Sequence, residues 1–250
     1  MDVAAPSWLA FLLFGVSLLA LAALSAQISL ELQRVVYHLT GSIDYAVVVF
    51  FLLLLPGILI HEASHWIVAK VLGLKPGKFR VWPVRKGRMV GLGSVTTRSG
   101  GIWLDSLVGI APLVMGTLLV GFLSRQWFAA EVLANAFSNG SLRGWLESLS
   151  SAFRQPDAAL WAYLVFTIAN GMMPSAPDRE PVKPVLVYVG LAALGYLLLG
   201  LPLDPVRQTL EAGSARLMWL NSALVVTIAL DVVVLVVLFL LSALTAPRRR

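Results

Sequence analysis

The 250-residue chain is 58% hydrophobic and only 13% charged. Soluble globular domains average about 45–50% apolar and about 25% charged residues, so this composition excludes an ordinary soluble protein. A net charge of +6 could suit a nucleic-acid partner, but the basic residues lie in loops between apolar segments, where anchoring to lipid headgroups is the favoured explanation. The absence of cysteine excludes disulfides and thiolate metal sites.

The apolar residues form long blocks, and a transmembrane helix needs about 20 such residues in a row. The first block differs from a signal peptide, because it follows no basic n-region and exceeds the usual ~7–15 apolar residues. We therefore predict a single all-α polytopic membrane domain over residues 1–250, with about six transmembrane helices. The six blocks are 7–26, 45–72, 102–123, 158–174, 184–201 and 217–245.

The basic residues are distributed unevenly between the loops. Eight of the nineteen lie from Lys70 to Arg98, at the end of the second block and in the loop to the third, and five more lie at Arg179, Lys183 and 248–250. With six crossings these positions share one side, which the positive-inside rule makes cytoplasmic. We therefore expect both termini to be cytoplasmic and the protein to reside in the cell membrane.

Residues 78–97 differ in composition from the blocks around them. The stretches KFRVWPV, RKGR and MVGLGSVTT are rich in β-branched and aromatic residues, with glycine at the breaks. This pattern predicts a β-hairpin. We expect it to lie at the cytoplasmic membrane surface, either as an interfacial anchor or as an exposed edge that holds an extended substrate.

The stretch HEASH at 61–65 places three polar side chains inside the second apolar block. Because each such group is costly at membrane depth, the cluster favours a function over chance. His61 and His65 are one helical turn apart and can reach one metal ion, while Glu62 borders it without being a ligand. This is the HExxH pattern of metal-dependent peptidases.

A catalytic zinc site needs a third protein ligand. His38 is expected on the opposite side of the membrane, Asp105 begins the third block, and Asp231 lies deep in the sixth. Asp178 ends the segment ANGMMPSAPDRE after the fourth block, on the same side as HEASH. Prolines in this segment break the helix, and irregular backbone at membrane depth is tolerated where it lines a cavity.

Together these features resemble the site-2 protease family of intramembrane zinc metalloproteases. In that family the HExxH helix is followed much later by a segment that commonly reads N-x-x-P-x-x-x-L-D-G, and Asn170 and Asp178 keep its spacing. HEASHWIVAKVLGLK and GIAPLVMG at 109–116 are also similar to family segments. The likeness covers a core of about 45–180; the blocks at 7–26, 184–201 and 217–245 are accessory spans, and no PDZ-like domain is expected.

This sequence departs from the family pattern at three positions near Asp178, and GIAPLVMG lacks the usual asparagine after its glycine-proline pair. Pro174 stands one position late, Pro177 replaces the leucine, and Arg179 replaces the glycine after the aspartate. The chain is therefore similar to a divergent member of the family.

The resemblance implies zinc held by His61, His65 and Asp178, with Glu62 as the general base that passes a proton from water to the leaving amine. Asn170 is expected to hydrogen-bond the substrate backbone or the developing oxyanion, and a helix-end hydrogen bond is the open alternative. The expected substrate is a transmembrane or membrane-proximal segment of a single-span or membrane-anchored protein, which must unwind locally.

Two other classes of function use the same residues. A metal-ion transporter usually has paired interrupted helices in two related halves, but this sequence has one interrupted segment. A catalytically inactive membrane scaffold would keep the fold without needing Glu62.

Overall fold

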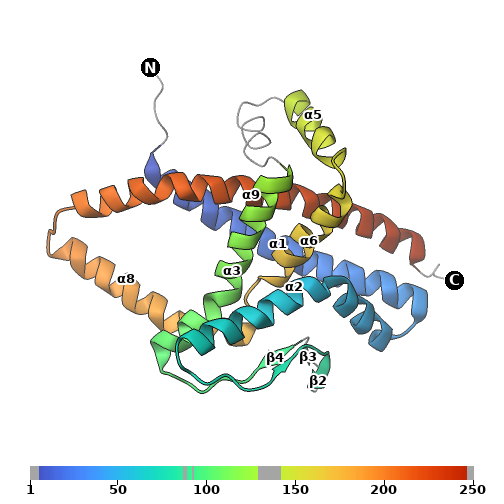
Figure 1. Ribbon diagram of the computed structural model, residues 1–250, viewed down its shortest axis with the longest axis horizontal. Helices are drawn as coiled ribbons and strands as arrows, with labels where there is room; N and C mark the ends of the chain where they lie inside the picture. Colours follow the sequence, from blue (N-terminus) through green and yellow to red (C-terminus); the bar gives the residue numbers. More distant parts are fainter. Residues whose placement is uncertain (1–5, 87–88, 92, 129–141, 247–250) are drawn as a thin grey trace.

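The computed structural model describes residues 6–86, 89–91, 93–128 and 142–246. Helices dominate it (Figure 1), as the apolar blocks predict. The helices are α1 (Ser7–Thr40), α2 (Ile43–Val71), α3 (Ile102–Phe128), α5 (Leu142–Phe153), α6 (Ala158–Gly171), α7 (Ala176–Arg179), α8 (Val182–Leu198) and α9 (Asp204–Thr245). The strands are β1 (Phe79–Arg80), β2 (Val84–Lys86), β3 (Met89–Gly91) and β4 (Ser94–Val95).

Five helical segments in the described chain are long and apolar enough to cross a membrane: α1, α2, most of α3, α7 with α8, and the last thirty residues of α9. The prediction of a multi-pass membrane protein is therefore supported. The fourth predicted block differs, because α6 has only 14 residues. At 1.5 Å per residue it is about 21 Å long, shorter than the ~30 Å hydrocarbon core.

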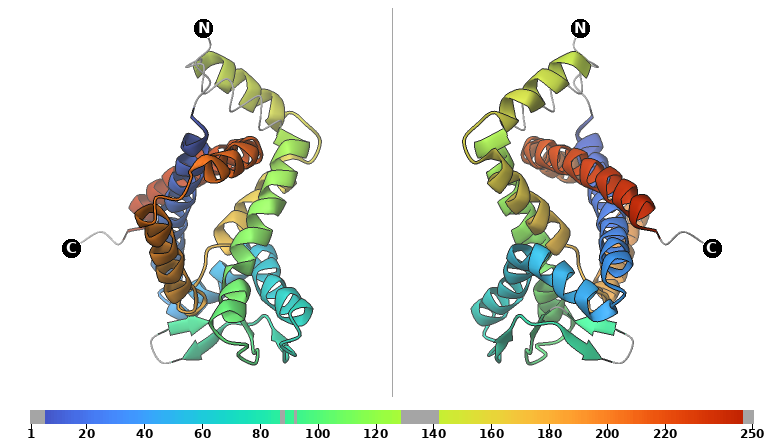
Figure 2. Two further views of the ribbon diagram at one scale, coloured as in Figure 1. Left: turned by 90° about the vertical axis from the view of Figure 1, so that its left-hand side faces the viewer. Right: turned by 90° about the vertical axis from the view of Figure 1, so that its right-hand side faces the viewer.

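The fourth block follows α3 in the opposite direction, and the fifth begins beside the N-terminal end of α3. Prolines at 174, 177 and 181 interrupt the path between α6 and α8. From the C-terminal to the N-terminal end of α3, the neighbouring pairs are Trp127 with Trp161, Gly116 with Met172, Gly109 with Asp178, Ser106 with Pro181, and Trp103 with Tyr188. The fourth block therefore runs antiparallel to α3, whereas α8 starts beside the N-terminal end of α3 and leads away from the strands toward the start of α9 (Figures 1 and 2).

Helices α1 and α9 lie side by side and run parallel (Figures 1 and 2). Near the first turn of α1 the Ala10 carbonyl accepts from the amide of Asn221, in the middle of α9, and near the C-terminal ends of both helices His38 meets Thr245. In a six-span arrangement the first and last helices would be antiparallel. This packing therefore also differs from the six-span prediction.

The strands lie at one end of the molecule, beside α2 and α3 (Figure 2). β1 pairs with β4 and β2 pairs with β3, both antiparallel, as two separate two-stranded units. The segment thus does not form the single continuous hairpin predicted for 78–97. Pro83 lacks an N–H donor and Gly93 has little strand propensity, and they separate the two pairs.

The helices that surround the polar motif approach each other closely through glycine. A Cβ on Gly57 of α2 would lie 1.8 Å from the Thr167 carbonyl oxygen, and one on Gly171 would lie 2.6 Å from the Gly57 backbone. Small residues at helix interfaces in membranes allow such close backbone contact. The carbonyl groups at the end of α6 are thereby brought beside the HEASH turn of α2.

Candidate metal centre

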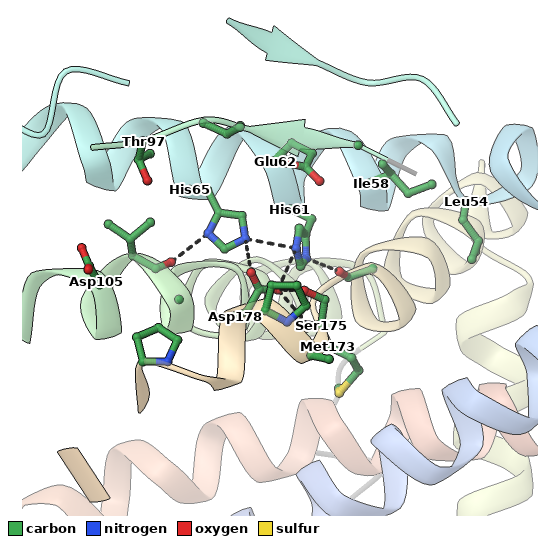
Figure 3. Close-up of a pocket in the computed structure, with 18 of the residues that line it drawn as sticks. Leu54, Ile58, His61, Glu62, His65, Thr97, Asp105, Met173, Ser175 and Asp178 are labelled. Atoms are coloured by element: carbon green, nitrogen blue, oxygen red, sulfur yellow. Dashed lines mark hydrogen bonds and ion pairs between the residues drawn. The ribbon is translucent and has the colours of Figure 1, made fainter. Parts of the chain in front are cut away.

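His61 and His65 of α2 face Asp178 of α7 across a short gap (Figure 3). The Nε2 atoms of the two histidines are 3.2 Å apart. His65 Nε2 lies 3.2 Å from Asp178 Oδ1, and His61 Nε2 lies 3.5 Å from Asp178 Oδ2. Within the part of the chain that the structure describes, this is a group of side chains that could hold a metal ion.

Backbone carbonyls fix the orientation of both imidazole rings. His61 Nδ1 donates to the Gly171 carbonyl at 2.7 Å, and His65 Nδ1 donates to the Val108 carbonyl at 2.8 Å. Because a carbonyl only accepts, each Nδ1 carries a proton, and each neutral ring presents a bare Nε2 lone pair to the gap. Such outer hydrogen bonds orient histidine ligands in metal sites. Two lone pairs and a carboxylate therefore face one point, where a metal ion could bind.

Asp178 is held in place from its own chain segment. Its Oδ2 accepts the Ser175 N–H at 2.7 Å and the Ser175 hydroxyl at 2.5 Å. The carbonyl of Asp178 lies against Gly109 of α3, where a Cβ would be only 2.4 Å away. Arg179, which replaces the family glycine, is exposed, and the carboxylate faces the imidazoles.

Glu62 lies beside the three residues and lines the same cavity, whose volume is about 860 Å³. The carboxyl group is 8% exposed and packs against Gly93, where a Cβ would be 2.6 Å from Glu62 Oε1. The strand segment thus closes over the acid from the side opposite α7 (Figure 3). The Glu62 carboxyl group therefore borders the ligand group without belonging to it.

The structure also places the other acids and the third histidine. His38 contacts Thr245 at the far end of α1, and Asp105 accepts hydrogen bonds from Ser99 and Gly100 ahead of α3. Asp231 is buried and contacts Asn170. Among the described residues none of these three belongs to the ligand group, although Asp105 lines the same cavity.

Asn170 is engaged inside the protein. Its Nδ2 donates to the Phe166 carbonyl at 2.9 Å and to Asp231 Oδ1 at 3.1 Å, which uses both amide hydrogens. In this conformation the side chain has no donor left for an oxyanion. The helix-end hydrogen bond, the alternative considered for this residue, is present.

Sequence reasoning missed three groups that order the site. The role of Ser175 could have been predicted from the sequence, because S-A-P-D at 175–178 has the S-x-x-D spacing of a capping box. The carbonyl groups of Val108 and Gly171 could not have been predicted as the partners of the histidines. Every residue has a backbone carbonyl, and only tertiary packing selects which one contacts a histidine.

Comparison with protein-family models, curated proteins and solved structures gives no match for this chain.

Proposed function

We propose that this chain is an intramembrane zinc metalloprotease that works like the site-2 proteases its motifs resemble. The observation that carries the proposal is the convergence of His61, His65 and Asp178, with Glu62 beside them, in the wall of one cavity. The three ligand candidates come from two segments more than 100 residues apart in sequence. Such a meeting of polar groups among apolar helices is costly without a purpose.

The spacing of the ligand atoms suits zinc. Ligands at about 2.0–2.1 Å in a tetrahedral site lie about 3.3 Å from one another. The separations of 3.2 Å between the two Nε2 atoms, and of 3.2 and 3.5 Å from them to the carboxylate oxygens, bracket that value. Three protein ligands leave the fourth position open, as in catalytic zinc sites.

Each residue then has a defined chemical task. A zinc ion held there supplies Lewis-acid activation of water and of the scissile carbonyl. Glu62 takes the proton from the attacking water and delivers it to the leaving amine. Ser175 holds the Asp178 carboxylate, and the Gly171 and Val108 carbonyls keep both imidazoles in the ligating tautomer.

The cavity supports a peptide substrate with apolar side chains. Phe50, Leu54 and Ile58 continue the cavity wall along α2 beyond the histidines, and their spacing of four places them on one helix face. Gly93 and Val95 line the wall formed by the strand segment. An extended substrate segment could lie between these walls, beside β4. This favours a membrane-spanning or membrane-proximal segment of a single-span or membrane-anchored protein.

The basic loop between α2 and α3 supports a cytoplasmic opening. The strand segment of that loop lies beside the cavity, and the loop carries the largest group of basic residues in the chain. By the positive-inside rule it faces the cytoplasm, and we infer that the enzyme resides in the cell membrane.

The proposal is tested by separating metal binding from catalysis. Purified Glu62→Gln should bind zinc like the wild type but lose cleavage of single-span substrates by about 100-fold or more, because only the base is removed. His65→Ala should lose zinc and cleavage together. Zinc is measured by elemental analysis, and Glu147→Gln on α5 is the matched control. Proteolysis at the wild-type rate by Glu62→Gln would exclude this mechanism.

A further inference from the structure

A second polar contact lies behind the metal centre, between α6 and α9. Asp231 is 1% exposed and Asn170 is 8% exposed. The apolar residues packed around this junction include Ile168, Ala169 and Leu230. Asn170 Nδ2 donates to Asp231 Oδ1 at 3.1 Å.

The remaining oxygen atoms of this pair have no hydrogen-bond partner in the described structure. They are Asn170 Oδ1 and Asp231 Oδ2, and both are buried. The direction of the amide is fixed, because its nitrogen faces two acceptors, Asp231 Oδ1 and the Phe166 carbonyl. Two unpartnered acceptors, one on each residue, therefore remain at the same contact.

A single proton on Asp231 gives both of these oxygen atoms a hydrogen-bond partner. A protonated carboxyl group is both a donor and an acceptor. With its proton on Oδ2, Asp231 can donate to Asn170 Oδ1 while Oδ1 continues to accept from Nδ2. The two groups then form a cyclic acid–amide pair, and no buried charge is left among apolar helices.

The pair is connected to the metal centre through one peptide unit. Asn170 is followed directly by Gly171, whose carbonyl accepts the Nδ1 proton of His61. Ser25 of α1 donates to the Asn170 carbonyl at 3.4 Å. The last turn of α6 is thus held from α9 and α1 on one side and meets the metal ligand on the other.

We propose that Asp231 is a neutral carboxylic acid that forms a cyclic pair with Asn170, and so positions the Gly171 carbonyl that orients His61. Its role for the metal rests on the proposed function; the pair itself does not. Asp231 is a positioning residue here, because it acts through Asn170 and touches neither metal nor substrate.

Two substitutions at Asp231 distinguish a neutral carboxylic acid from a charged carboxylate at this position. Asp231→Asn keeps one donor and one acceptor facing Asn170, so zinc affinity and cleavage should stay within about threefold of the wild type. Asp231→Leu leaves the Asn170 groups buried without partners, and zinc affinity should fall by about 10- to 100-fold, as for other losses behind a metal ligand. The Co²⁺-substituted protein should show an altered ligand-field spectrum in Asp231→Leu alone. Val233→Leu, on the exposed face of α9, is the control.

Infrared spectroscopy tests the pair without reference to metal or activity. The wild type should show the carbonyl band of a protonated carboxylic acid, and Asp231→Asn should lack it. Loss of only a carboxylate band in that variant, or an Asp231→Asn variant as impaired as Asp231→Leu, would overturn the inference. If the wild type bound no zinc but showed the acid band, the proposed function would fail and the pair would stand.

Discussion

The position of Asp178 depends on the surrounding structure more than the positions of the two histidines do. The two histidines are placed by the regular turn of α2, but the carboxylate is placed by Ser175, by the close contact with Gly109 and by the break in the helix path. A carboxylate fixed by its own backbone loses little conformational entropy on binding metal. The Asp178 carboxylate is therefore already positioned for the metal binding that we propose.

Substitution tests that assignment directly. Asp178→Asn keeps the size of the side chain but removes the negative charge that a dication needs, so zinc affinity should fall by about 10- to 100-fold or more and cleavage should stop. Competition with a chelator measures the affinity. Glu180→Ala, two positions along the chain and exposed, should change neither quantity. Wild-type zinc affinity in Asp178→Asn would remove Asp178 from the ligand set.

Between elements, the contact of α2 with α6 decides whether the ligands meet. Gly57 and Gly171 bring the two backbones together, and the Gly171 carbonyl reaches His61 only because of that approach. Packing between membrane helices depends on close van der Waals contact, since lipid is as apolar as the helix surface. The stability of this contact and the geometry of the metal centre are therefore linked.

Gly57→Ala should disturb both properties. The added methyl group would lie 1.8 Å from the Thr167 carbonyl oxygen, so the helices must separate, at a cost of about 1–3 kcal/mol or more in the free energy of unfolding. The thermal midpoint in detergent and the zinc affinity should fall together. Gly190→Ala on α8, with nothing within 4 Å of the new methyl group, should leave both unchanged. A drop in the midpoint with unaltered zinc affinity would show that the contact is structural alone.

At the scale of the whole molecule, the number of crossings sets where the termini lie. Five long apolar segments are found in the described chain, and α1 and α9 run parallel. These two observations agree with an odd number of crossings. The arginines at 248–250 favour an even number by the charge rule, so the two lines of argument differ for the C-terminus.

We predict that the helix packing gives the correct topology, and that the C-terminus lies on the side of the membrane opposite to the basic loop between α2 and α3. The chain has no cysteine, so single cysteines at Ser7, Lys78, Arg143 and Ala246 can be labelled with an impermeant reagent without background. Ser7→Cys and Lys78→Cys should react from one side of the membrane, and Arg143→Cys and Ala246→Cys from the other. Labelling of positions 78 and 246 from the same side would restore six crossings and separate α6 from α8 as independent spans.

The sequence by itself determined the membrane class and the candidate metal ligands. Long apolar blocks exclude a soluble fold, because hydrocarbon thickness fixes how many apolar residues a span needs. The pairing of His61 with His65 and the separate position of Glu62 follow from helix periodicity, which needs no tertiary information. Asp178 could be singled out from its motif spacing, and the structure brings it to the histidines.

Only the tertiary structure decided what holds these groups and how the later helices run. Which carbonyls orient the imidazoles, and which acid holds Asn170, depend on contacts between residues far apart in the chain. The same is true of the direction of α8, because a proline break ends a helix but does not say where the chain turns. Local pattern encodes periodicity and composition, whereas direction and register between elements are set by packing, which no single segment contains.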